Sequence, residues 1–224
     1  MLSLPTARFR AATLRTIRSF FDERGYLEVD VPAMSSELIP EAHIEVFRTE
    51  MVDPYGGDPE PRYLLPSPEL PMKRLLAAGY GNMYYLGKSY RNAESTSPRH
   101  RPEFTMLEWY TVHADSTSQA RLATELLHVL AEELPHADAS SAAARAAAAP
   151  PEHLPVTDAL SRYAGTPPDL FSRPEGLREA ALALDMRVDA HETREDRFQR
   201  ILLTFVEPEL PRDRPVFLTD YPAL

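Results

Sequence analysis

An arginine between two strand-like runs is the feature of this sequence best suited to chemistry. Arg91 follows an apolar run over residues 83–90, and a second strand-like run over residues 103–110 returns after a short polar loop. A planar, permanently charged guanidinium can hold a phosphoryl group through two hydrogen bonds and stabilise the negative charge that builds on its oxygens. Arg91 is therefore a candidate for phosphoryl chemistry. The alternative is a surface hairpin with Arg91 in a salt bridge and Phe104 in the core.

A second candidate site precedes this hairpin. Ser67, Pro68 and Glu69 stand just before an amphipathic helix that starts around Met72. The carboxylate of Glu69 can hold a cationic amine in a cleft, which gives orientation as well as affinity. The same residues suit a helix start, since Ser67 is a favoured cap, Pro68 fits the first helical position and Glu69 suits the positive helix end. The two roles are compatible.

The segment before these candidates predicts a helix and a strand that position them. Residues 6–24 carry apolar side chains at helical spacing. These are Leu14, Ile17, Phe20 and Phe21. Gly25 is expected to end the helix, as glycine often does, and residues 26–32 alternate as a strand that stops at Pro32. Many α/β proteins contain this order of elements, so the pattern alone does not indicate a function. It supports one only because it precedes the two candidate sites.

The string from Glu103 to Tyr110, Glu-Phe-Thr-Met-Leu-Glu-Trp-Tyr, resembles the end of motif 2 of class II aminoacyl-tRNA synthetases. In that family, motif 2 is a strand–loop–strand that holds ATP bent for attack at its α-phosphate. The string is most similar to the lysyl-tRNA synthetase branch, and within it to the short ligases that attach lysine or β-lysine to elongation factor P. The helix and strand of residues 6–32 resemble motif 1, the element through which the class dimerises, so a homodimer is expected.

The resemblance implies an ATP-binding role for several residues. Arg91 would be the catalytic contact to the α-phosphate, Phe104 would stack on the adenine, and His100 would lie near the phosphates or the adenine. The family pattern places a glutamate two residues after the arginine, where this chain has Ala93. Glu94 is therefore expected to take over that adenine contact.

The resemblance also implies an amino-acid site. Ser67 and Glu69 would face the substrate, with Glu69 holding its α-amino group, and Tyr110 matches the substrate-side tyrosine of the family. The alternative for Tyr110 is a buried core position. ATP and Mg²⁺ are the implied cofactors, the ion being held mostly by phosphate oxygens and carboxylates. The histidines show no metal-ligand spacing, and no metal site is predicted from the chain itself.

The implied fold is α+β, an antiparallel sheet flanked by helices, without the last elements of the family's domain. Residues 1–135 are expected to form the part of the core with motifs 1 and 2, and residues 136–155 an alanine- and proline-rich linker or short exposed helix without an apolar face. Residues 156–224 are expected to hold a small helical part and the start of the next core strands. Further helices are predicted over residues 118–134, 156–163, 177–184 and 193–204.

Absent features narrow the expected function. No anticodon-binding barrel precedes motif 1, and 24 Lys and Arg against 34 Asp and Glu give a net charge of −10, which disfavours nucleic-acid binding. No contact with a tRNA anticodon is therefore expected. The resembled family continues past the position of Leu224 with metal- and ATP-linked glutamates and with motif 3, so we expect the 224-residue chain to be inactive or severely impaired.

The remaining composition fits a cytoplasmic protein. The chain has no cysteine, which leaves no disulfide or thiolate zinc site, and it has neither a signal peptide nor an apolar run long enough to span a membrane. The function implied by the resemblance is ATP-dependent activation of lysine or β-lysine and transfer to a lysine of elongation factor P. The alternatives are a lysyl-tRNA synthetase fragment that charges tRNA, and an inactive remnant that acts as a binding or dimerisation module.

Overall fold

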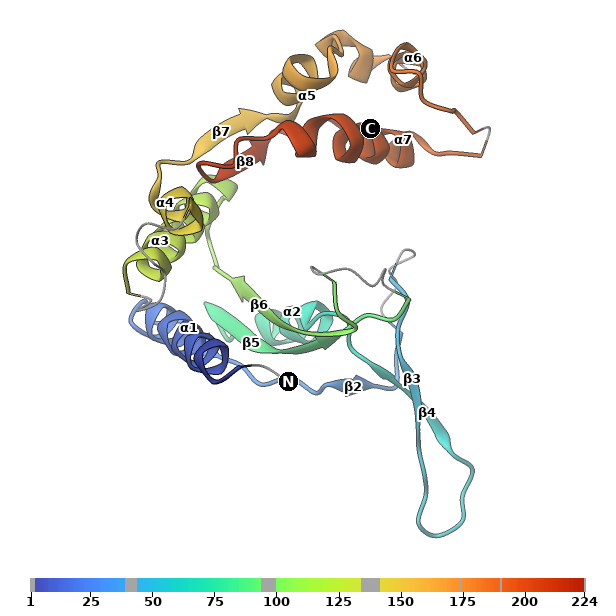
Figure 1. Cartoon of the computed structure of the whole chain (residues 1–224). Helices are drawn as coiled ribbons and strands as arrows, with labels where there is room; N and C mark the ends of the chain where they lie inside the picture. Colours follow the sequence, from blue (N-terminus) through green and yellow to red (C-terminus); the bar gives the residue numbers. More distant parts are fainter. Residues whose placement is uncertain are drawn as a thin grey trace. The chain divides into compact units, whose positions relative to one another are not determined.

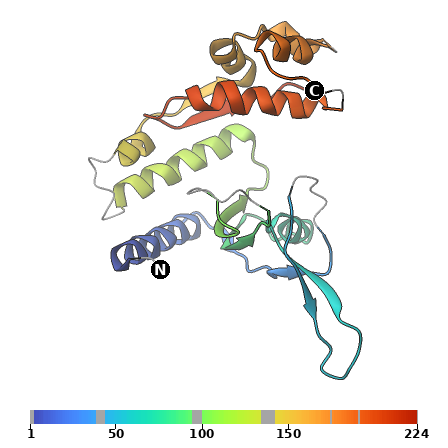
Figure 2. The ribbon, with the colours of Figure 1, turned by 45° about the vertical axis from the view of Figure 1, so that its right-hand side comes forward.

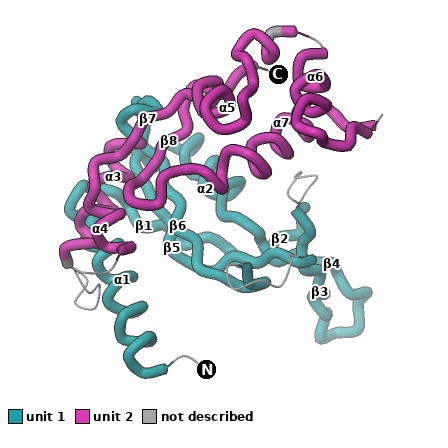
Figure 3. The backbone as a smooth tube through the Cα atoms, turned by 45° about the horizontal axis from the view of Figure 1, so that its top comes forward, with its two compact units in different colours: residues 1–119 teal, residues 120–224 magenta. Residues whose placement is uncertain are grey.

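The computed structural model of this chain describes residues 3–38, 44–93, 100–133, 142–173, 175–189 and 191–223. The chain divides into two compact units, residues 1–119 and residues 120–224 (Figure 3). Helix α3 (Ser116–Glu133) crosses from the first unit into the second. Each unit combines helices with strands, as the predicted α+β class requires.

Helix α1 (Leu4–Asp22) opens the first unit and confirms the helix predicted over residues 6–24, two residues earlier in the chain (Figure 1). Three of its apolar side chains are buried: Ile17, Phe20 and Phe21. Gly25 follows with a φ of 73°, a backbone conformation that glycine adopts without strain. Strand β1 (Leu27–Glu28) comes next. The strand predicted over residues 26–32 is thus much shorter, because only these two residues pair with a neighbour.

The first unit is built around a sheet in the order β1, β5 (Met83–Tyr90) and β6 (Glu103–Tyr110). Strands β5 and β6 are antiparallel over eight residues, which confirms the predicted strand–loop–strand, whereas β1 pairs with β5 in parallel. Helix α2 (Glu69–Ala77) lies between β4 and β5 in the chain. A second sheet has the order β2 (Met34–Ser35), β4 (Glu60–Leu64) and β3 (Arg48–Met51), and all its pairs are antiparallel.

Helices α1 and α2 cover opposite faces of the first sheet. Side chains alternate between the two faces of a strand. On one face, the ring of Phe21 from α1 stacks on Tyr84 at 4.8 Å between centroids and contacts Trp109 at 5.5 Å. On the other face, Met72 from α2 is buried with Met83. This second face carries the odd-numbered residues of β5 and, in register, the even-numbered residues of β6.

A polar network fixes α1 against the sheet. The phenol of Tyr84, a fully buried residue, donates to Asp22 Oδ1 at 2.9 Å and is 3.2 Å from Glu28 Oε2. Arg18 Nε in turn donates to both oxygens of Glu28, at 2.9 and 3.1 Å. Burial raises the pKa of Tyr84, and its hydrogen bonds to Asp22 and Glu28 and the charges of these carboxylates raise it further. The phenol is therefore held protonated as a donor.

Replacement of Tyr84 by phenylalanine is expected to lower the free energy of unfolding by about 1–3 kcal/mol at pH 7, because the hydrogen bonds of the buried phenol to the charged carboxylates of Asp22 and Glu28 are lost. The native state holds the phenol proton more tightly than the unfolded state does. This contribution is therefore present below the ordinary tyrosine pKa, about 10, and is lost as the pH rises through the native pKa. Urea unfolding should show the gap between wild type and Tyr84→Phe narrowing above pH 10. The exposed-site variant Tyr80→Phe should show neither effect.

The second unit contains the helices predicted after residue 156. Helices α5 (Val156–Ala164), α6 (Gly176–Ala183) and α7 (Arg194–Ile201) confirm three of the predicted segments. A 3₁₀ helix, η1 (Pro168–Ser172), precedes α6, and α7 runs on into a π-helical turn, η2 (Leu202–Val206), and a further 3₁₀ turn, η3 (Glu207–Glu209). The capping box of Thr193 and Asp196 sets the start of α7.

Part of the segment expected to be a linker has regular structure. Residues 142–148 form α4 (Ala142–Ala148), and residues 152–155 form β7 (Glu152–Pro155). Strand β7 pairs in parallel with β8 (Val216–Thr219). The expectation that the alanine-rich stretch has nothing to bury is wrong for Ala144, which is 9% exposed.

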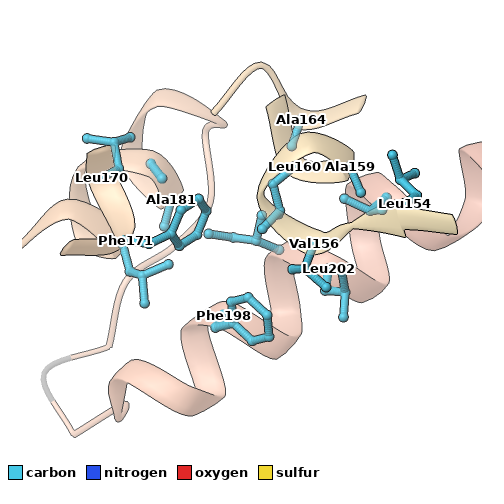
Figure 4. Close-up of a cluster of buried hydrophobic side chains, with 14 residues drawn as sticks. Leu154, Val156, Ala159, Leu160, Ala164, Leu170, Phe171, Ala181, Phe198 and Leu202 are labelled. Atoms are coloured by element: carbon cyan, nitrogen blue, oxygen red, sulfur yellow. The ribbon is translucent and has the colours of Figure 1, made fainter. Parts of the chain in front are cut away.

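A cluster of buried side chains forms the core of the second unit (Figure 4). It joins residues of α5 and α6 to residues of α7 and η2, with Leu154 contributed by β7. Val156, Leu160, Leu177 and Ile201 are fully enclosed. Burial of such aliphatic side chains contributes about 1.5–3 kcal/mol each, which explains how short helices hold together.

Replacement of Gly176 by alanine is expected to disrupt this core. Gly176 begins α6, and a Cβ there would lie 1.8 Å from the carbonyl oxygen of Leu170 and 2.6 Å from its carbonyl carbon. Because the obstacle is backbone, we expect Gly176→Ala to lower the free energy of unfolding by about 2 kcal/mol or more in urea. The control is Gly165→Ala: Gly165 has a φ of 61° and open space around it, so it should cost only about 1 kcal/mol. Equal losses would contradict the assigned clash.

Candidate active site

The candidate residues of β6 lie on the α2 face of the first sheet. Phe104, Glu108 and Tyr110 share this face because their positions differ by even numbers. Their partners across the strand pair are Ser89, Tyr85 and Met83 respectively. The face opposite carries the side chains that pack against α1. Strand alternation therefore gathers the candidate side chains of β6 on one surface.

Glu108 joins the residues predicted to face the amino acid. Ser67 Oγ donates to Glu108 Oε2 at 2.9 Å, and Tyr110 Oη donates to Glu108 Oε1 at 3.0 Å. Glu108 was not predicted as a site residue, although it is separated from Phe104 and Tyr110 by even numbers of residues in the string that carries the resemblance. This spacing places all three side chains on one face of a strand, and it could have identified Glu108 from the sequence. We call Ser67, Glu69, Glu108 and Tyr110 the amine cluster.

The start of α2 places Glu69 in the amine cluster. Ser67 Oγ accepts the backbone N–H of Glu69 at 3.1 Å, but Ser67 lies one residue before the capping position, which Pro68 occupies without a side-chain hydrogen bond. Pro68 is the residue before the helix and not its first residue, because the helical backbone starts only at Glu69. The Glu69 carboxylate forms an ion pair with Lys73, one turn further along the same helix. Glu69 thus already contacts an ammonium group.

The carboxylates of Glu108 and Glu69 both affect the pKa of the Tyr110 phenol. Burial raises the pKa of Tyr110, the hydrogen bond to Glu108 and its charge raise it further, and the charge of Glu69 adds to the effect. Tyr110 therefore stays protonated at neutral pH and keeps Glu108 Oε1 in place as an acceptor. Two carboxylates beside one phenol form a negatively charged end of the site that suits a cationic amine.

Arg91 lies at the other end of the same face. Its guanidinium carbon is 5.4 Å from the centre of the Phe104 ring. Its backbone N–H donates to Pro102 O at 3.0 Å, and the next N–H, from Asn92, donates to Glu45 O at 2.9 Å. These bonds hold the backbone of Arg91 between β6 and the segment before β3.

The guanidinium of Arg91 has unused hydrogen-bonding capacity. Its Nε is buried and has no hydrogen-bond partner in the described part of the chain. The described residues also supply no ion pair to this arginine. The surface salt bridge considered as the alternative is thus absent from this part of the chain, and Phe104 is only partly buried. Buried donors without partners are rare in proteins and call for an explanation, such as a ligand.

The other two ATP-side predictions are not tested. His100 is exposed on the segment that leads into β6, and its role stays a prediction. Glu94 lies outside the described residues. Among the residues that the structure does describe, no group of three acidic or histidine side chains could hold a metal ion.

The two ends of the site are separated by a length that suits an aminoacyl adenylate. Glu108 and Phe104 are four residues apart on β6, which corresponds to about 13 Å at the usual strand rise. The surface between them is lined by Gly87 and Met106, which are directly opposite each other. One face of the sheet therefore offers carboxylates for an amine at one end, and a cation beside an aromatic ring at the other.

No helix in the described ranges is both long and apolar enough to cross a membrane.

Comparisons with known proteins show the family of the chain. The sequence profile of tRNA synthetases class II (D, K and N) matches residues 4–224. The chain is 40% identical over 216 residues to the Elongation factor P--(R)-beta-lysine ligase of Yersinia enterocolitica, and equally to proteins of that name from Yersinia pestis and Yersinia pseudotuberculosis. Each alignment covers 96% of this chain but 61% of the relative, so the chain spans less than two thirds of these curated relatives.

Proposed function

Because the chain belongs to the class II tRNA synthetase family (D, K and N), we propose that it provides the ATP- and amine-binding surface of a ligase that activates lysine or β-lysine. The acceptor of the activated amino acid is a lysine amine of elongation factor P. The observation that carries this proposal is the single face of the first sheet, on which the amine cluster and the Arg91–Phe104 pair stand at opposite ends. The reaction is placed in the cytoplasm because its acceptor is a translation factor.

The amine cluster binds the cationic end of the amino acid. Glu69 supplies a carboxylate that already pairs with an ammonium group, that of Lys73. Glu108 supplies a second carboxylate, which Ser67 and Tyr110 orient through one hydrogen bond to each oxygen. Such fixed acceptors lose little freedom on binding, so they position the substrate as well as hold it. A substrate with a neutral side chain would form no ion pair with these carboxylates, and one with an acidic side chain would be repelled by them.

The Arg91–Phe104 pair binds the nucleotide. The Phe104 ring stacks on the adenine. The Arg91 guanidinium, whose Nε has no partner among the described residues and which lies beside that ring, donates to the α-phosphate. In the activation step, a carboxylate oxygen of the amino acid forms a bond to the α-phosphorus while the bond to pyrophosphate breaks. Negative charge builds on the phosphoryl oxygens, and a positioned guanidinium stabilises it. The acceptor amine then attacks the carbonyl carbon, and AMP leaves.

Magnesium is the ion that ATP chemistry of this kind implies, and it would neutralise charge on the phosphates. The described part of the chain contains no group of carboxylates that could bind it. We therefore assign it no ligand among these residues, and no step depends on one.

Selective binding of amines tests this proposal. Isothermal titration calorimetry with the 224-residue chain should detect L-lysine and (R)-β-lysine, with and without ATP. Aspartate and asparagine, the other amino acids named by the family, share the α-ammonium that Glu69 would hold, but their side chains carry no second ammonium group for Glu108, so they should bind at least about tenfold more weakly. Aspartate binding as tight as lysine binding would rule out the amine cluster as the specificity site.

We also propose that the chain forms a homodimer through the region of α1 and β1. Strand β1 is an edge strand, and Leu27 on it is 50% exposed. Replacement of Leu27 by aspartate should raise the dissociation constant of the dimer about tenfold or more, because a charge is placed in an apolar contact. Sedimentation velocity measures this change. An unchanged dimer in the Leu27→Asp variant would place the contact elsewhere.

A further inference from the structure

A hairpin formed by β3 and β4 projects from the first unit and carries an apolar tip (Figure 2). We propose that this tip, residues 51–57, docks the protein that accepts the activated amino acid. The inference rests on the proposed function, since it assumes a macromolecular acceptor. It assigns to the chain a second contact with that acceptor, away from the reacting groups.

The base of the hairpin is part of the rim of the candidate active site. Strand β4 leads directly into Ser67 and Glu69 of the amine cluster. Leu65, just after β4, accepts the N–H of Tyr90 at 3.0 Å, next to Arg91. On the other strand, Glu45 pairs with Asn92 on the far side of Arg91. The base of the hairpin therefore adjoins both ends of the site, the amine cluster and Arg91.

The reach of the hairpin excludes a role for its tip in holding a small substrate. Its base is closed by the hydrogen bond from Leu64 N to Phe47 O at 2.9 Å. The paired strands extend four residues beyond this bond, about 13 Å at the usual rise, and the loop of residues 52–59 extends further. An amino acid or a nucleotide bound at Glu69 and Arg91 cannot fill that distance. A protein acceptor can.

The tip is a preformed turn. The Asp53 carboxylate accepts the N–H of Tyr55 at 2.9 Å and that of Gly57 at 3.2 Å, and the Asp53 carbonyl accepts the N–H of Gly56 at 3.2 Å. A Cβ at Gly57 would lie 2.4 Å from Asp53 Oδ2, so the turn closes tightly around this carboxylate. Ordering the backbone in advance lowers the entropy cost of a contact made at the tip.

The chemistry of the tip indicates the partner. Tyr55 is 95% exposed, Val52 70% and Met51 50%, and tyrosine is among the residues that most often dominate binding energies. The flanking side chains Glu50 and Asp58 are exposed and acidic, whereas the acidic Glu60 is paired with Arg62. This combination fits a partner that presents apolar groups beside basic ones, as a segment around an acceptor lysine does.

The test measures binding of the elongation factor P of the same organism, produced without its lysine modification. Titration calorimetry compares the wild-type chain with Tyr55→Ala, with Tyr55→Phe and with Asp53→Ala. We expect Tyr55→Ala to weaken binding at least about tenfold, Tyr55→Phe to retain most of it, and Asp53→Ala to weaken it by releasing the turn. The matched control is Tyr80→Ala, which removes another exposed tyrosine of the first unit and should bind like wild type. Lysine and ATP binding should be the same in all variants.

Each outcome is decisive. If wild type binds elongation factor P and Tyr55→Ala binds it equally, the docking role is wrong and the proposed function stands. If wild type does not bind elongation factor P while lysine and ATP still bind, the assignment of the acceptor fails and the docking role fails with it. If Tyr55→Ala instead changes only the sedimentation coefficient of the chain, the tip contacts a second copy and the proposal is wrong.

Discussion

Replacement of Arg91 by alanine is expected to weaken ATP binding about a hundredfold. The guanidinium has a buried Nε without a partner in the described part of the chain, and no carboxylate of those residues neutralises it. Its hydrogen-bonding capacity is thus available for a phosphate, and a hydrogen bond to a charged group contributes about 1.5–3 kcal/mol. Arg91→Lys should not restore binding, because an ammonium group cannot reproduce the two parallel bonds of the planar fork.

Calorimetric titration of ATP with magnesium measures this effect. The matched control is Arg8→Ala, which removes an exposed arginine of α1 and leaves the site intact. Circular dichroism should report the same fold for all three variants, since Nε of Arg91 donates to none of the residues that the structure describes. If wild type and Arg91→Ala bind ATP with the same affinity, Arg91 has no contact with the nucleotide and the ATP end of the site is wrongly placed.

Replacement of either carboxylate of the amine cluster is expected to weaken lysine binding while ATP binding changes little. Glu69→Gln keeps the shape of the side chain but loses its charge, and a hydrogen bond to a charged group contributes about 1.5–3 kcal/mol. We expect a loss of tenfold or more. Glu108→Gln should lose at least as much, because the charge is removed and one of the two hydroxyl donors, from Ser67 or Tyr110, then faces an amide nitrogen that cannot accept its hydrogen bond.

Strand β6 itself provides the control for these variants. Glu103 lies on the opposite face of the same strand, where it pairs with Lys88. Glu103→Gln therefore makes the same chemical change outside the amine cluster and should bind lysine like wild type. Lysine affinity that is unchanged in Glu69→Gln would reduce Glu69 to a residue of the helix start, which was its alternative role.

Much of the secondary structure is readable from local patterns. Helices α1, α5, α6 and α7 follow apolar residues at helical spacing, and these residues are buried in the structure. Strand β6 coincides with the string that carries the family resemblance, and β5 coincides with the apolar run before Arg91. Such patterns are local because each helix or strand must present one apolar face to a core, whatever that core contains.

Elements that depend on distant partners were missed. Strand β7 lies in a segment that was expected to be a linker, and it forms because residues 152–155 pair with residues 216–219, more than 60 positions later. The hairpin of β3 and β4 has no alternating apolar pattern, since residues 48–51 are exposed on both faces, and Pro61 argues against a strand. The hairpin forms because its two strands pair with each other, which its composition does not predict.

The sequence by itself determined the family, the helices and the identity of most candidate residues, because these depend on residue types at short spacing. The tertiary structure alone decided which of these residues meet. Ser67 and Glu108 are 41 positions apart, and their hydrogen bond exists only because α2 covers the face of the sheet that carries the even-numbered residues of β6. That Nε of Arg91 is buried without a partner among the described residues was likewise unpredictable, since burial and hydrogen-bond satisfaction are properties of the packed chain and not of any string within it.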